Sequence, residues 1–338
     1  MKRFAEGLIV GKFSPLHLGH EALINLARAQ CERLILVSYS LPELPGCEAE
    51  KRRRWLATRF PDCLSVVVTP QLAQQWGLTM PDNLAADALH RHFMASLCLD
   101  VLHCKPDAVF TAEEYGDGFA HVLSARFAKP VEHIRTQRGA SPPVISGTRI
   151  RSDVHRYRHM MAPEVYADFV ERICILGGES TGKSTLTVAL AAALNTACVA
   201  EYGREWWEHK KGNLNPDDML HIALTQIARE EQARPCRYLI CDTSPLTTLL
   251  YAQHYFDRVD PQLEALSYRC YSLVVFCEAD FPFVQDGTRQ DTAFQAMQQQ
   301  WYLQTLSRRG IPFLRVSGSV EQRVDQIMTA LQTRREPF

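Results

Sequence analysis

The sequence lacks the features that mark membrane-spanning and nucleic-acid-binding proteins. No window of about 18 uncharged apolar residues is present, so no segment is expected to cross a bilayer, and no apolar leader precedes the first motif. Charges nearly cancel, with 37 lysines and arginines against 38 acidic residues in 338. A chain without a net charge of one sign has no overall attraction for nucleic acid or for a membrane surface. We therefore expect a cytoplasmic protein with no nucleic acid and no membrane as partner.

Cysteine spacings typical of metal and redox sites are also missing. The 11 cysteines are scattered, no two of them form a C-x-x-C pair, and their odd number argues against a complete disulfide framework. Cys174 and Cys277 lie within apolar runs, where a free thiol packs as a small hydrophobic side chain. We expect reduced cysteines in a reducing compartment.

The length and the order of apolar segments predict two α/β domains. A chain of 338 residues is long enough for two domains of ordinary size, and 46% hydrophobic residues suffice for buried cores. In both halves, short apolar runs alternate with helical patterns, which is typical of a parallel sheet covered by helices. The predicted strands are 7–10, 34–38, 64–69, 108–111, 173–176, 197–200, 238–241, 273–276 and 312–316, and the predicted helices are 19–31, 48–60, 84–99, 183–194 and a closing helix that ends near 334.

Residues 151–172 separate the two series of strands and helices. This stretch is rich in charge, histidine and methionine, contains Pro163 and has no strand character. We expect a short helix there, with a domain boundary near residue 170. The predicted domains are therefore residues 1–168 and residues 169–338.

The middle of the chain carries a phosphate-binding motif of the form G-x-x-x-x-G-K-[ST]. It follows a predicted strand and opens a predicted helix, where backbone N–H groups can hold phosphate. We expect Lys183 to reach the β- and γ-phosphates of ATP and Ser184 to bind Mg²⁺. A glycine-rich turn that meets the pattern by chance would not account for the flanking strand and helix. The predicted ATP-binding residues are Gly177, Gly178, Glu179, Ser180, Thr181, Gly182, Lys183, Ser184 and Thr185.

Other positions in this half suit phosphoryl transfer. Asp242 follows a predicted strand, as a carboxylate that holds Mg²⁺ does, although an exposed helix cap would show the same pattern. Glu201 ends another strand, with Arg204 three residues later. Its carboxylate can accept the proton of a substrate hydroxyl, or the two residues can form a solvated ion pair. The sequence leaves open which carboxylate is the general base. Arg289 ends the segment 286–289, which is either an ordinary turn or a mobile segment whose arginine neutralises transition-state charge.

A second phosphate site is predicted at the N-terminus. His17 and His20 form an H-x-G-H motif at a helix start, where both imidazoles can hydrogen-bond nucleotide phosphates while another phosphate attacks the α-phosphorus. Such a histidine pair is common by chance. A second segment, 145–151, has the form I-S-x-T-x-I-R and adds hydroxyls and Arg151, although alone it would also fit an ordinary helix cap. The predicted ATP-binding residues here are Gly11, Lys12, Phe13, His17, Gly19, His20, Ser146, Thr148 and Arg151.

The two N-terminal segments, in this order, resemble the HxGH nucleotidyltransferase superfamily. With the P-loop downstream, the chain is similar to NadR-type bifunctional nicotinamide mononucleotide adenylyltransferase/ribosylnicotinamide kinases. The matching segments are 11–20, 145–151, 175–185, 201–205, 242–248 and 286–289. The resemblance implies an HxGH Rossmann-like domain over residues 1–168 and a P-loop kinase domain over residues 169–338.

The resemblance further implies two consecutive steps of NAD biosynthesis. The C-terminal domain would phosphorylate nicotinamide riboside with ATP and Mg²⁺, and the N-terminal domain would join the resulting nicotinamide mononucleotide to AMP, giving NAD and pyrophosphate. The implied catalytic residues are His17, His20 and Arg151 in the first domain and Lys183, Glu201, Asp242 and Arg289 in the second. The implied substrate residues are Glu201, Tyr202, Arg204, Asp242 and Trp76, and the implied metal ligands are Ser184 and Asp242.

The sequence departs from the family pattern at three places. Some members begin with a DNA-binding helix-turn-helix, whereas here the H-x-G-H strand begins within ten residues of Met1, so we expect no repressor module. Ser244 stands where the family pattern has a second aspartate. The stretch 82–86 has none of the tryptophans expected before Phe93, and Trp76 lies upstream of it.

Two other functions remain open at this stage. One is a different nucleoside kinase joined to an adenylyltransferase with another acceptor. The other is a nucleotide-sensing regulatory protein whose N-terminal domain binds NAD or ATP without turnover. The sequence does not decide whether the chain forms a homo-oligomer.

Overall fold

The computed structural model describes residues 2–112, 115–135, 145–256, 258–285, 287 and 289–334. It divides into two compact units, residues 1–169 and residues 170–338, hereafter unit 1 and unit 2. Each unit is built on one five-stranded sheet, and all strand pairs in both sheets are parallel. The structure therefore confirms the predicted class of two parallel-sheet α/β domains. None of the described helices is long and apolar enough to cross a membrane.

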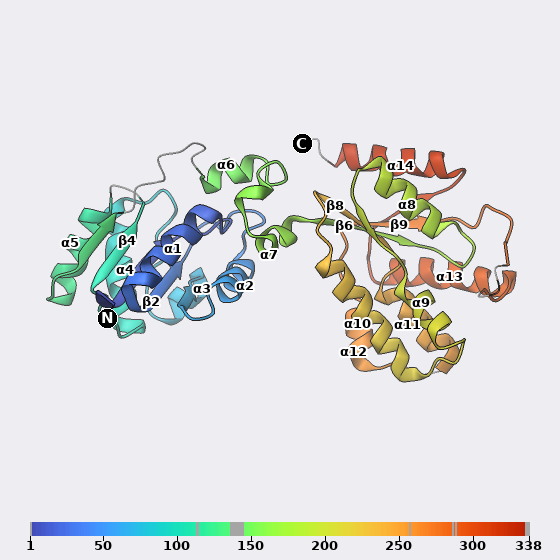
Figure 1. Cartoon of the computed structure of the whole chain (residues 1–338), viewed down its shortest axis with the longest axis horizontal. Coiled ribbons are helices and arrows are strands. Elements are labelled where there is room, and N and C mark those ends of the chain that lie inside the picture. The colour runs from blue at the N-terminus through green and yellow to red at the C-terminus, as the bar shows by residue number, and fades with distance from the viewer. Residues whose placement is uncertain are drawn as a thin grey trace. The chain divides into compact units, whose positions relative to one another are not determined.

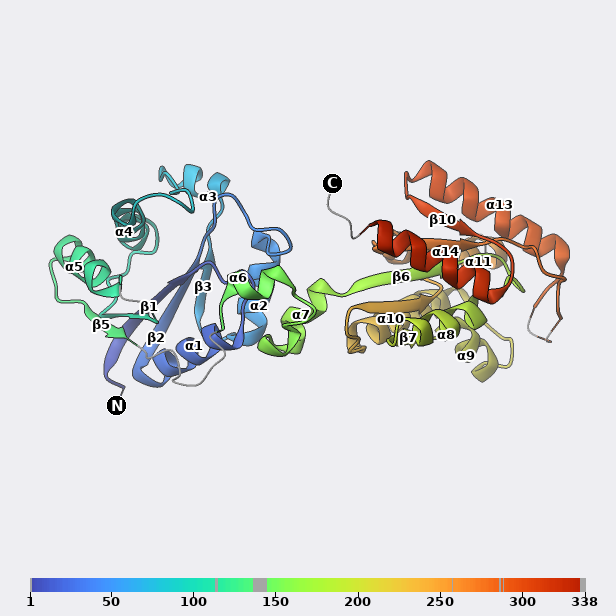
Figure 2. The ribbon, with the colours of Figure 1, turned by 90° about the horizontal axis from the view of Figure 1, so that it is seen from above.

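Unit 1 has the strand order β3-β2-β1-β4-β5, so the order reverses between β1 and β4. Figure 2 shows α1 on one face of this sheet and α4 and α5 on the other. The strands are β1 (Phe4–Gly11), β2 (Cys31–Ser38), β3 (Leu64–Val67), β4 (Ala108–Thr111) and β5 (Glu132–Arg135). The helices are α1 (Leu18–Gln30), α2 (Ala49–Arg59), α3 (Pro70–Gln75), α4 (Asp87–Ser96), α5 (Gly116–Phe127), α6 (Gly147–Ser152) and α7 (Pro163–Tyr166), with a π-helix at Leu97–Val101 and 3₁₀ turns at Arg158–Met160 and Ala167–Phe169.

Unit 2 has the strand order β10-β9-β6-β8-β7. Figure 1 shows α8 and α14 together on one face of its sheet and α10 to α13 on the other. The strands are β6 (Glu171–Leu176), β7 (Ala197–Val199), β8 (Tyr238–Asp242), β9 (Leu273–Cys277) and β10 (Phe313–Val316). The helices are α8 (Lys183–Ala193), α9 (Tyr202–His209), α10 (Pro216–Gln232), α11 (Pro245–Phe256), α12 (Pro261–Leu266), α13 (Thr292–Arg308) and α14 (Val320–Thr333).

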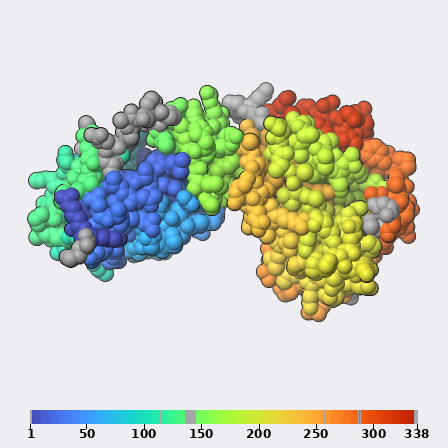
Figure 3. All heavy atoms as spheres, viewed as in Figure 1, coloured from blue at the N-terminus to red at the C-terminus, as the bar shows by residue number. Residues whose placement is uncertain are grey.

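Ligands bind open parallel sheets beyond the carboxyl ends of the strands, and both predicted phosphate motifs lie at such ends. The loop after β1 leads into α1, and the loop after β6 leads into α8. Both β1 and β6 are central strands that pair on each side. The yellow atoms of unit 2 in Figure 3 belong to α9 and α10, and an apolar cluster around Met219 and Ile222 is buried in this part of the unit.

Several elements differ from those expected. The helix expected at 84–99 begins only at Asp87 and continues as the π-helix, because Asn83 and its neighbours are held in a loop by hydrogen bonds to Leu41 and Pro42. The single short helix expected between 151 and 172 is replaced by a series of short helices and turns over 147–169. Helices α3, α5 and α9 to α13, and strand β5, have no counterpart among the predicted elements.

Candidate active sites

The β1–α1 loop brings both histidines of the H-x-G-H motif to the N-terminus of α1. His17 is buried, and its Nδ1 accepts the backbone N–H of His20 at 3.2 Å, so that its side chain caps the helix. The two imidazoles stack, with ring centroids 3.6 Å apart. Phe13 is buried and packs edge-on against His20. The motif thus places a ring pair at the N-terminus of a helix, the kind of position at which proteins bind anions.

Helix α6 brings the second motif against the first. Arg151 donates hydrogen bonds to the Ser14 carbonyl oxygen and, at 3.2 Å, to Thr148 Oγ1. A Cβ at Gly147 would lie 2.9 Å from the same Ser14 oxygen, and a Cβ at Gly19 would lie 3.6 Å from Cβ of Ile145. Two segments about 130 residues apart in the sequence therefore meet at the start of α1.

Ser146 begins α6 in the way that the sequence predicted. Its hydroxyl accepts the backbone N–H of Arg149 at 3.2 Å and caps the helix. Gly11 lies under the Phe13 ring, because a Cβ there would be 3.3 Å from it. Lys12 is exposed, and the pKa of its ammonium group is lowered by partial burial and then by the charge of Arg151. All nine predicted N-terminal residues thus belong to the β1–α1 junction or to α6.

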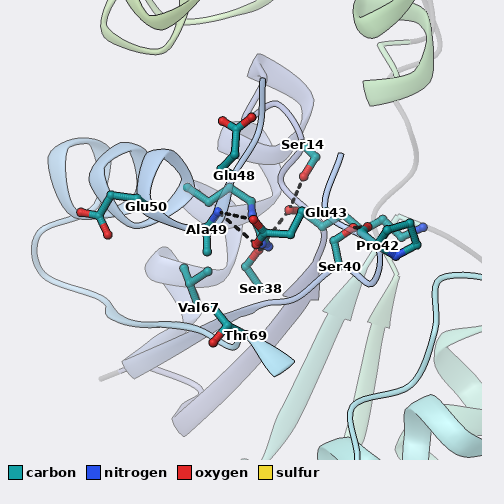
Figure 4. Close-up of polar contacts among 12 residues, drawn as sticks. Ser14, Ser38, Ser40, Pro42, Glu43, Glu48, Ala49, Glu50, Val67 and Thr69 are labelled. Atoms are coloured by element: carbon teal, nitrogen blue, oxygen red, sulfur yellow. Dashed lines mark hydrogen bonds and ion pairs between the residues drawn. The ribbon is translucent and has the colours of Figure 1, made fainter. Parts of the chain in front are cut away.

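A buried arginine that the sequence analysis missed supports this loop from behind. Arg52 of α2 is fully buried, and it donates to Ser38 Oγ at 2.7 Å and to Glu43 Oε1 at 2.8 Å. Ser38 donates in turn to the Lys12 carbonyl oxygen at 3.0 Å. Figure 4 shows Glu43 reaching back to Ala49, whose N–H it accepts at 3.1 Å. Because a buried cation is costly unless paired, this network fixes the loops after β1 and β2 relative to α2.

The loop before α4, where the family pattern has tryptophans, is held in place by Asn83. Asn83 donates through Nδ2 to Ser40 Oγ at 3.0 Å and to the Pro42 carbonyl oxygen at 2.8 Å, which ties the loop before α4 to the end of β2. Leu84 on this loop is 95% exposed. Trp76 caps the C-terminus of α3 and packs, partly buried, against the unit 1 core. Its role at the substrate stays a prediction.

The P-loop of unit 2 has the backbone that its glycines permit. Gly177 has φ 146°, and a Cβ there would lie 2.9 Å from the Cys277 carbonyl oxygen. Gly182 has φ 78° and caps α8, whose first residue is Lys183. Both glycines therefore fill positions that a side chain would strain. Lys183 Nζ lies 2.8 Å from the Gly178 carbonyl oxygen, inside the loop.

Two carboxylates gather beside Lys183. Asp242 ends β8 and is buried, and burial raises its pKa, although the charge of Lys183, a hydrogen bond with Ser184 and the charge of Arg204 act against that rise. The pKa of Glu201 is raised by burial and then by the negative charge of Asp242, while Lys183 and Arg204 oppose the shift. The predicted set of Lys183, Ser184, Glu201, Arg204 and Asp242 thus forms one electrostatically linked group.

The donor set at Asp242 suits Mg²⁺. Its Oδ1 is buried and has no hydrogen-bond partner in the described part of the chain, while Ser184 supplies a hydroxyl next to it. Carboxylate and hydroxyl oxygens are the ligands that Mg²⁺ prefers. Among the described residues, no three His, Cys, Asp or Glu side chains gather into a metal site. Ser184 and Asp242 would therefore hold Mg²⁺ only together with the phosphates and water that come with it.

A cavity of about 1240 Å³, its open mouth included, begins at the P-loop and extends away from it. Apolar and aromatic side chains line it, among them Trp207, Leu214, Met219 and Ile222, together with the hydroxyls of Ser244, Thr247 and Thr248. Glu201 and Arg204 line it as well, whereas Asp242 is not among its lining residues. The cavity therefore combines a phosphate-binding loop with apolar and aromatic walls, as a site for a small organic ligand does.

Two residues that the family resemblance singled out have local partners. Ser244 is buried and lines the cavity, and its hydroxyl accepts the N–H of Leu246 at 3.3 Å at the start of α11. Tyr202 does not line the cavity. Its hydroxyl lies 3.0 Å from His221 Nε2, and its ring lies under the guanidinium of Arg229. The predicted substrate contact of Tyr202 stays a prediction.

Arginines approach the P-loop from two sides. Arg289 lines the cavity, and its Nη1 lies 3.4 Å from Ser180 Oγ; Asp286 and Thr288 of the same motif lie outside the described residues. Arg323 of α14, which the sequence analysis missed, is buried and donates to the Thr181 carbonyl oxygen at 2.7 Å and to the Gly318 carbonyl oxygen at 3.0 Å. Arg323 thus fixes the P-loop backbone from outside.

Comparisons with known proteins agree with this geometry. A family described as "AAA domain" matches residues 172–323. The trifunctional NAD biosynthesis/regulator protein NadR of Salmonella typhimurium (strain LT2) is 30% identical over 307 residues, which cover 84% of this chain and 71% of the relative. The protein of the same name from Escherichia coli (strain K12) is 29% identical over 341 residues, covering 92% and 78%.

Solved structures give the same result for the fold. A crystal structure of NadR in complex with NAD and AMP-PNP superposes with a TM-score of 0.69 at 18% identity and covers 100% of this chain and 99% of that one. A crystal structure of NadR in complex with NR also has a TM-score of 0.69, at 18% identity and 96% coverage of both chains. The likeness to these structures shows the fold, and the identity to the Salmonella relative over most of both sequences shows the family. The chain belongs to the NadR family.

Proposed function

We propose that the protein catalyses two consecutive steps of NAD biosynthesis. Unit 2 phosphorylates the 5′-hydroxyl of nicotinamide riboside with ATP, and unit 1 transfers AMP from ATP to the resulting mononucleotide. The observation that supports this most strongly is the unit 2 cavity, which brings the P-loop, Glu201 and aromatic and apolar side chains to one site. The names of the relatives, and the solved NadR complexes with NAD, AMP-PNP and NR, point to the same metabolites.

In unit 2, the N–H groups at the start of α8 and the Lys183 ammonium hold the transferring phosphate. Glu201, which lines the cavity, accepts the proton of the 5′-hydroxyl as that oxygen attacks the γ-phosphorus, the bond from the γ-phosphorus to the bridging oxygen breaks and ADP leaves. We assign this role to Glu201 rather than to Asp242, because Glu201 lines the cavity whereas Asp242 does not and interacts with Ser184. Ser184 and Asp242 would hold Mg²⁺ together with the nucleotide phosphates, and its charge would neutralise part of theirs. Arg289 stabilises the charge on the transferring group.

In unit 1, no covalent intermediate is needed. The stacked His17 and His20 and the N–H groups of α1 bind the α- and β-phosphates of ATP, while Arg151 binds the β- and γ-phosphates from α6. The phosphate of the mononucleotide attacks the α-phosphorus, and the same positive groups stabilise the departing pyrophosphate. Magnesium enters with the nucleotide and needs few protein ligands.

The product assay tests the proposal directly. Purified protein with MgATP and nicotinamide riboside is expected to form nicotinamide mononucleotide first and then NAD with pyrophosphate, measured by chromatography. Each step is also assayed alone, with added mononucleotide for the second. Phosphorylation of a different nucleoside instead would support the first alternative function. Binding of NAD with pyrophosphate release no faster than background would indicate a sensor and contradict the proposal for unit 1.

The pH dependence of the kinase step should report Glu201. Protonated Glu201 cannot accept a proton, so kcat/KM for the riboside is expected to fall as pH drops through a pKa above the ordinary glutamate value of about 4.3. Removing the positive charge in Arg204→Ala is expected to move this limb to higher pH, because Arg204 opposes the rise of the Glu201 pKa. Arg204→Lys keeps the charge and serves as the matched control. Titration of ATP itself affects the wild type and both variants equally, so it cannot cause a difference between their pH profiles. If the acidic fall of kcat/KM in Arg204→Ala lay at the same pH as in the wild type, Glu201 would be ruled out as the titrating base.

A further inference from the structure

Glu179, inside the P-loop, has both carboxylate oxygens occupied by protein groups. The hydroxyl of Tyr251 in α11 donates to Oε1 at 3.0 Å, and the backbone N–H of Gln290 donates to Oε2 at 2.8 Å. The Tyr251 hydroxyl stays protonated, because burial raises its pKa well above the ordinary value. A carboxylate held in this way faces protein donors, and its negative charge would repel a nucleotide phosphate.

Three hydrogen bonds close a ring around Glu179. Its backbone N–H donates to Gln298 Oε1 at 2.7 Å, Gln298 Nε2 donates to the Tyr251 hydroxyl at 3.2 Å, and that hydroxyl donates back to the Glu179 carboxylate. Gln298 is buried, and an amide suits this place because it accepts and donates at once. The ring fixes the direction of the Glu179 side chain relative to α11 and α13.

The segment that carries Arg289 is bonded to the P-loop on both sides of that arginine. Gln290, the next residue, binds Glu179, and the N–H of Val284 donates to Ser180 Oγ at 2.8 Å. Arg289 Nη1 itself lies 3.4 Å from Ser180 Oγ. Within the segment, Gln285 Nε2 donates to the carbonyl oxygens of Arg289 at 2.8 Å and of Gln290 at 2.9 Å. The bond from Gln290 N–H to Glu179 connects the backbone next to Arg289 to the P-loop.

We propose that Glu179 is a positioning residue of the kinase site that acts through Arg289, and that Tyr251 and Gln298 hold it in place. The inference rests on the proposed kinase function and gives the Glu179 side chain a role other than the predicted contact with ATP. Arg289 touches the transferring phosphate, while Glu179 determines where the Arg289 guanidinium lies. The reaction therefore depends on a P-loop side chain that contacts neither substrate.

A double-mutant cycle tests this assignment. Glu179→Gln keeps the size and shape of the side chain but removes its negative charge. The Gln290 N–H then faces either an amide N–H₂, which cannot accept its hydrogen bond, or an amide oxygen, which accepts it more weakly than a carboxylate does. Its kinase kcat is expected to fall about tenfold with KM for ATP within about twofold, a smaller loss than the roughly hundredfold fall for Arg289→Ala. In the Arg289→Ala background, Glu179→Gln should have no further effect. Three results would overturn the proposal. Glu179→Gln could raise KM for ATP at unchanged kcat, it could have no effect in the wild type, or its loss could multiply with that of Arg289→Ala in the double mutant.

A measurement independent of catalysis separates this inference from the proposed function. Trypsin cleaves after arginine, so release of the Gln290 contact in Glu179→Gln should speed cleavage after Arg289 at least about fivefold, followed by mass spectrometry. The exposed Glu208 of α9 provides the matched control Glu208→Gln, which should change neither cleavage nor kinase kcat. Faster cleavage together with no phosphorylation of nicotinamide riboside by the wild type would uphold the contact and refute the kinase substrate. Equal cleavage in both variants would refute the contact.

Discussion

Replacing Lys183 with alanine is expected to abolish the kinase step, lowering its kcat by about 10³, while AMP transfer to added nicotinamide mononucleotide stays within about twofold of wild type. Lys183 is the first residue of α8, and its Nζ lies inside the P-loop, 2.8 Å from the Gly178 carbonyl oxygen. Its charge also opposes the raised pKa values of Glu201 and Asp242. The substitution therefore removes a phosphate ligand and favours protonation of both carboxylates.

Initial rates of the two half-reactions, each assayed with its own acceptor, measure this effect. Lys211 is exposed, lies in the same unit and does not line the cavity, so Lys211→Ala is the matched control and should leave both rates unchanged. Thermal unfolding of each variant shows whether unit 2 remains folded. Loss of both half-reactions in a folded Lys183→Ala protein would contradict separate active sites in the two units.

The parts of the candidate sites that could be predicted are those formed by short continuous segments of the sequence. A P-loop and an H-x-G-H motif each occupy one strand–loop–helix junction, and both junctions lie where expected, after β1 and after β6. The glycines at 177 and 182 have the positive φ angles that such loops need. That α6 lies against the β1–α1 loop could be expected only because the two short motifs occur together in the sequence, since neither motif alone predicts it.

The burial of two arginines could not be predicted from the sequence, because it depends on tertiary contacts. Arg52 lies in a run of basic residues, and Arg323 lies on an amphipathic helix, so both resemble ordinary surface charges in the sequence. Each is almost completely buried because the fold supplies acceptors for its guanidinium: Ser38 and Glu43 for Arg52, and the Thr181 carbonyl oxygen of the P-loop for Arg323. The same holds for Gln298, whose partners Glu179 and Tyr251 come from two other elements.

The missed helices and strand have a related cause. Strand β5 reads Glu-His-Ile-Arg and pairs with β4 alone at the edge of its sheet, so it lacks the apolar run of a central strand. Helix α13 has polar glutamines on the face that meets the P-loop, which weakens its apolar periodicity. The pattern in α13 was therefore obscured by glutamines that bond the P-loop backbone, Gln299 to the N–H of Gly178 and Gln298 to the N–H of Glu179.

Replacing His20 with alanine is expected to have the opposite selectivity. AMP transfer to the mononucleotide should fall by about 10² to 10³, because a side chain that stabilises the reacting phosphates is lost, while the kinase rate remains unchanged. His20 stacks on His17 with ring centroids 3.6 Å apart, and Phe13 packs against its edge, so alanine removes the ring without removing the helix cap that His17 provides. The helix start should therefore survive the substitution.

The product pattern makes this variant informative when both steps run together. With nicotinamide riboside and MgATP, His20→Ala should accumulate the mononucleotide and form almost no NAD, whereas Lys183→Ala should form neither. His121, exposed on α5 of the same unit, gives the matched control His121→Ala, which should convert the riboside to NAD at the wild-type rate. If His20→Ala still produced NAD at that rate, the β1–α1 junction would not be the site of AMP transfer. If it lost phosphorylation as well, the division of the two reactions between the units would be wrong.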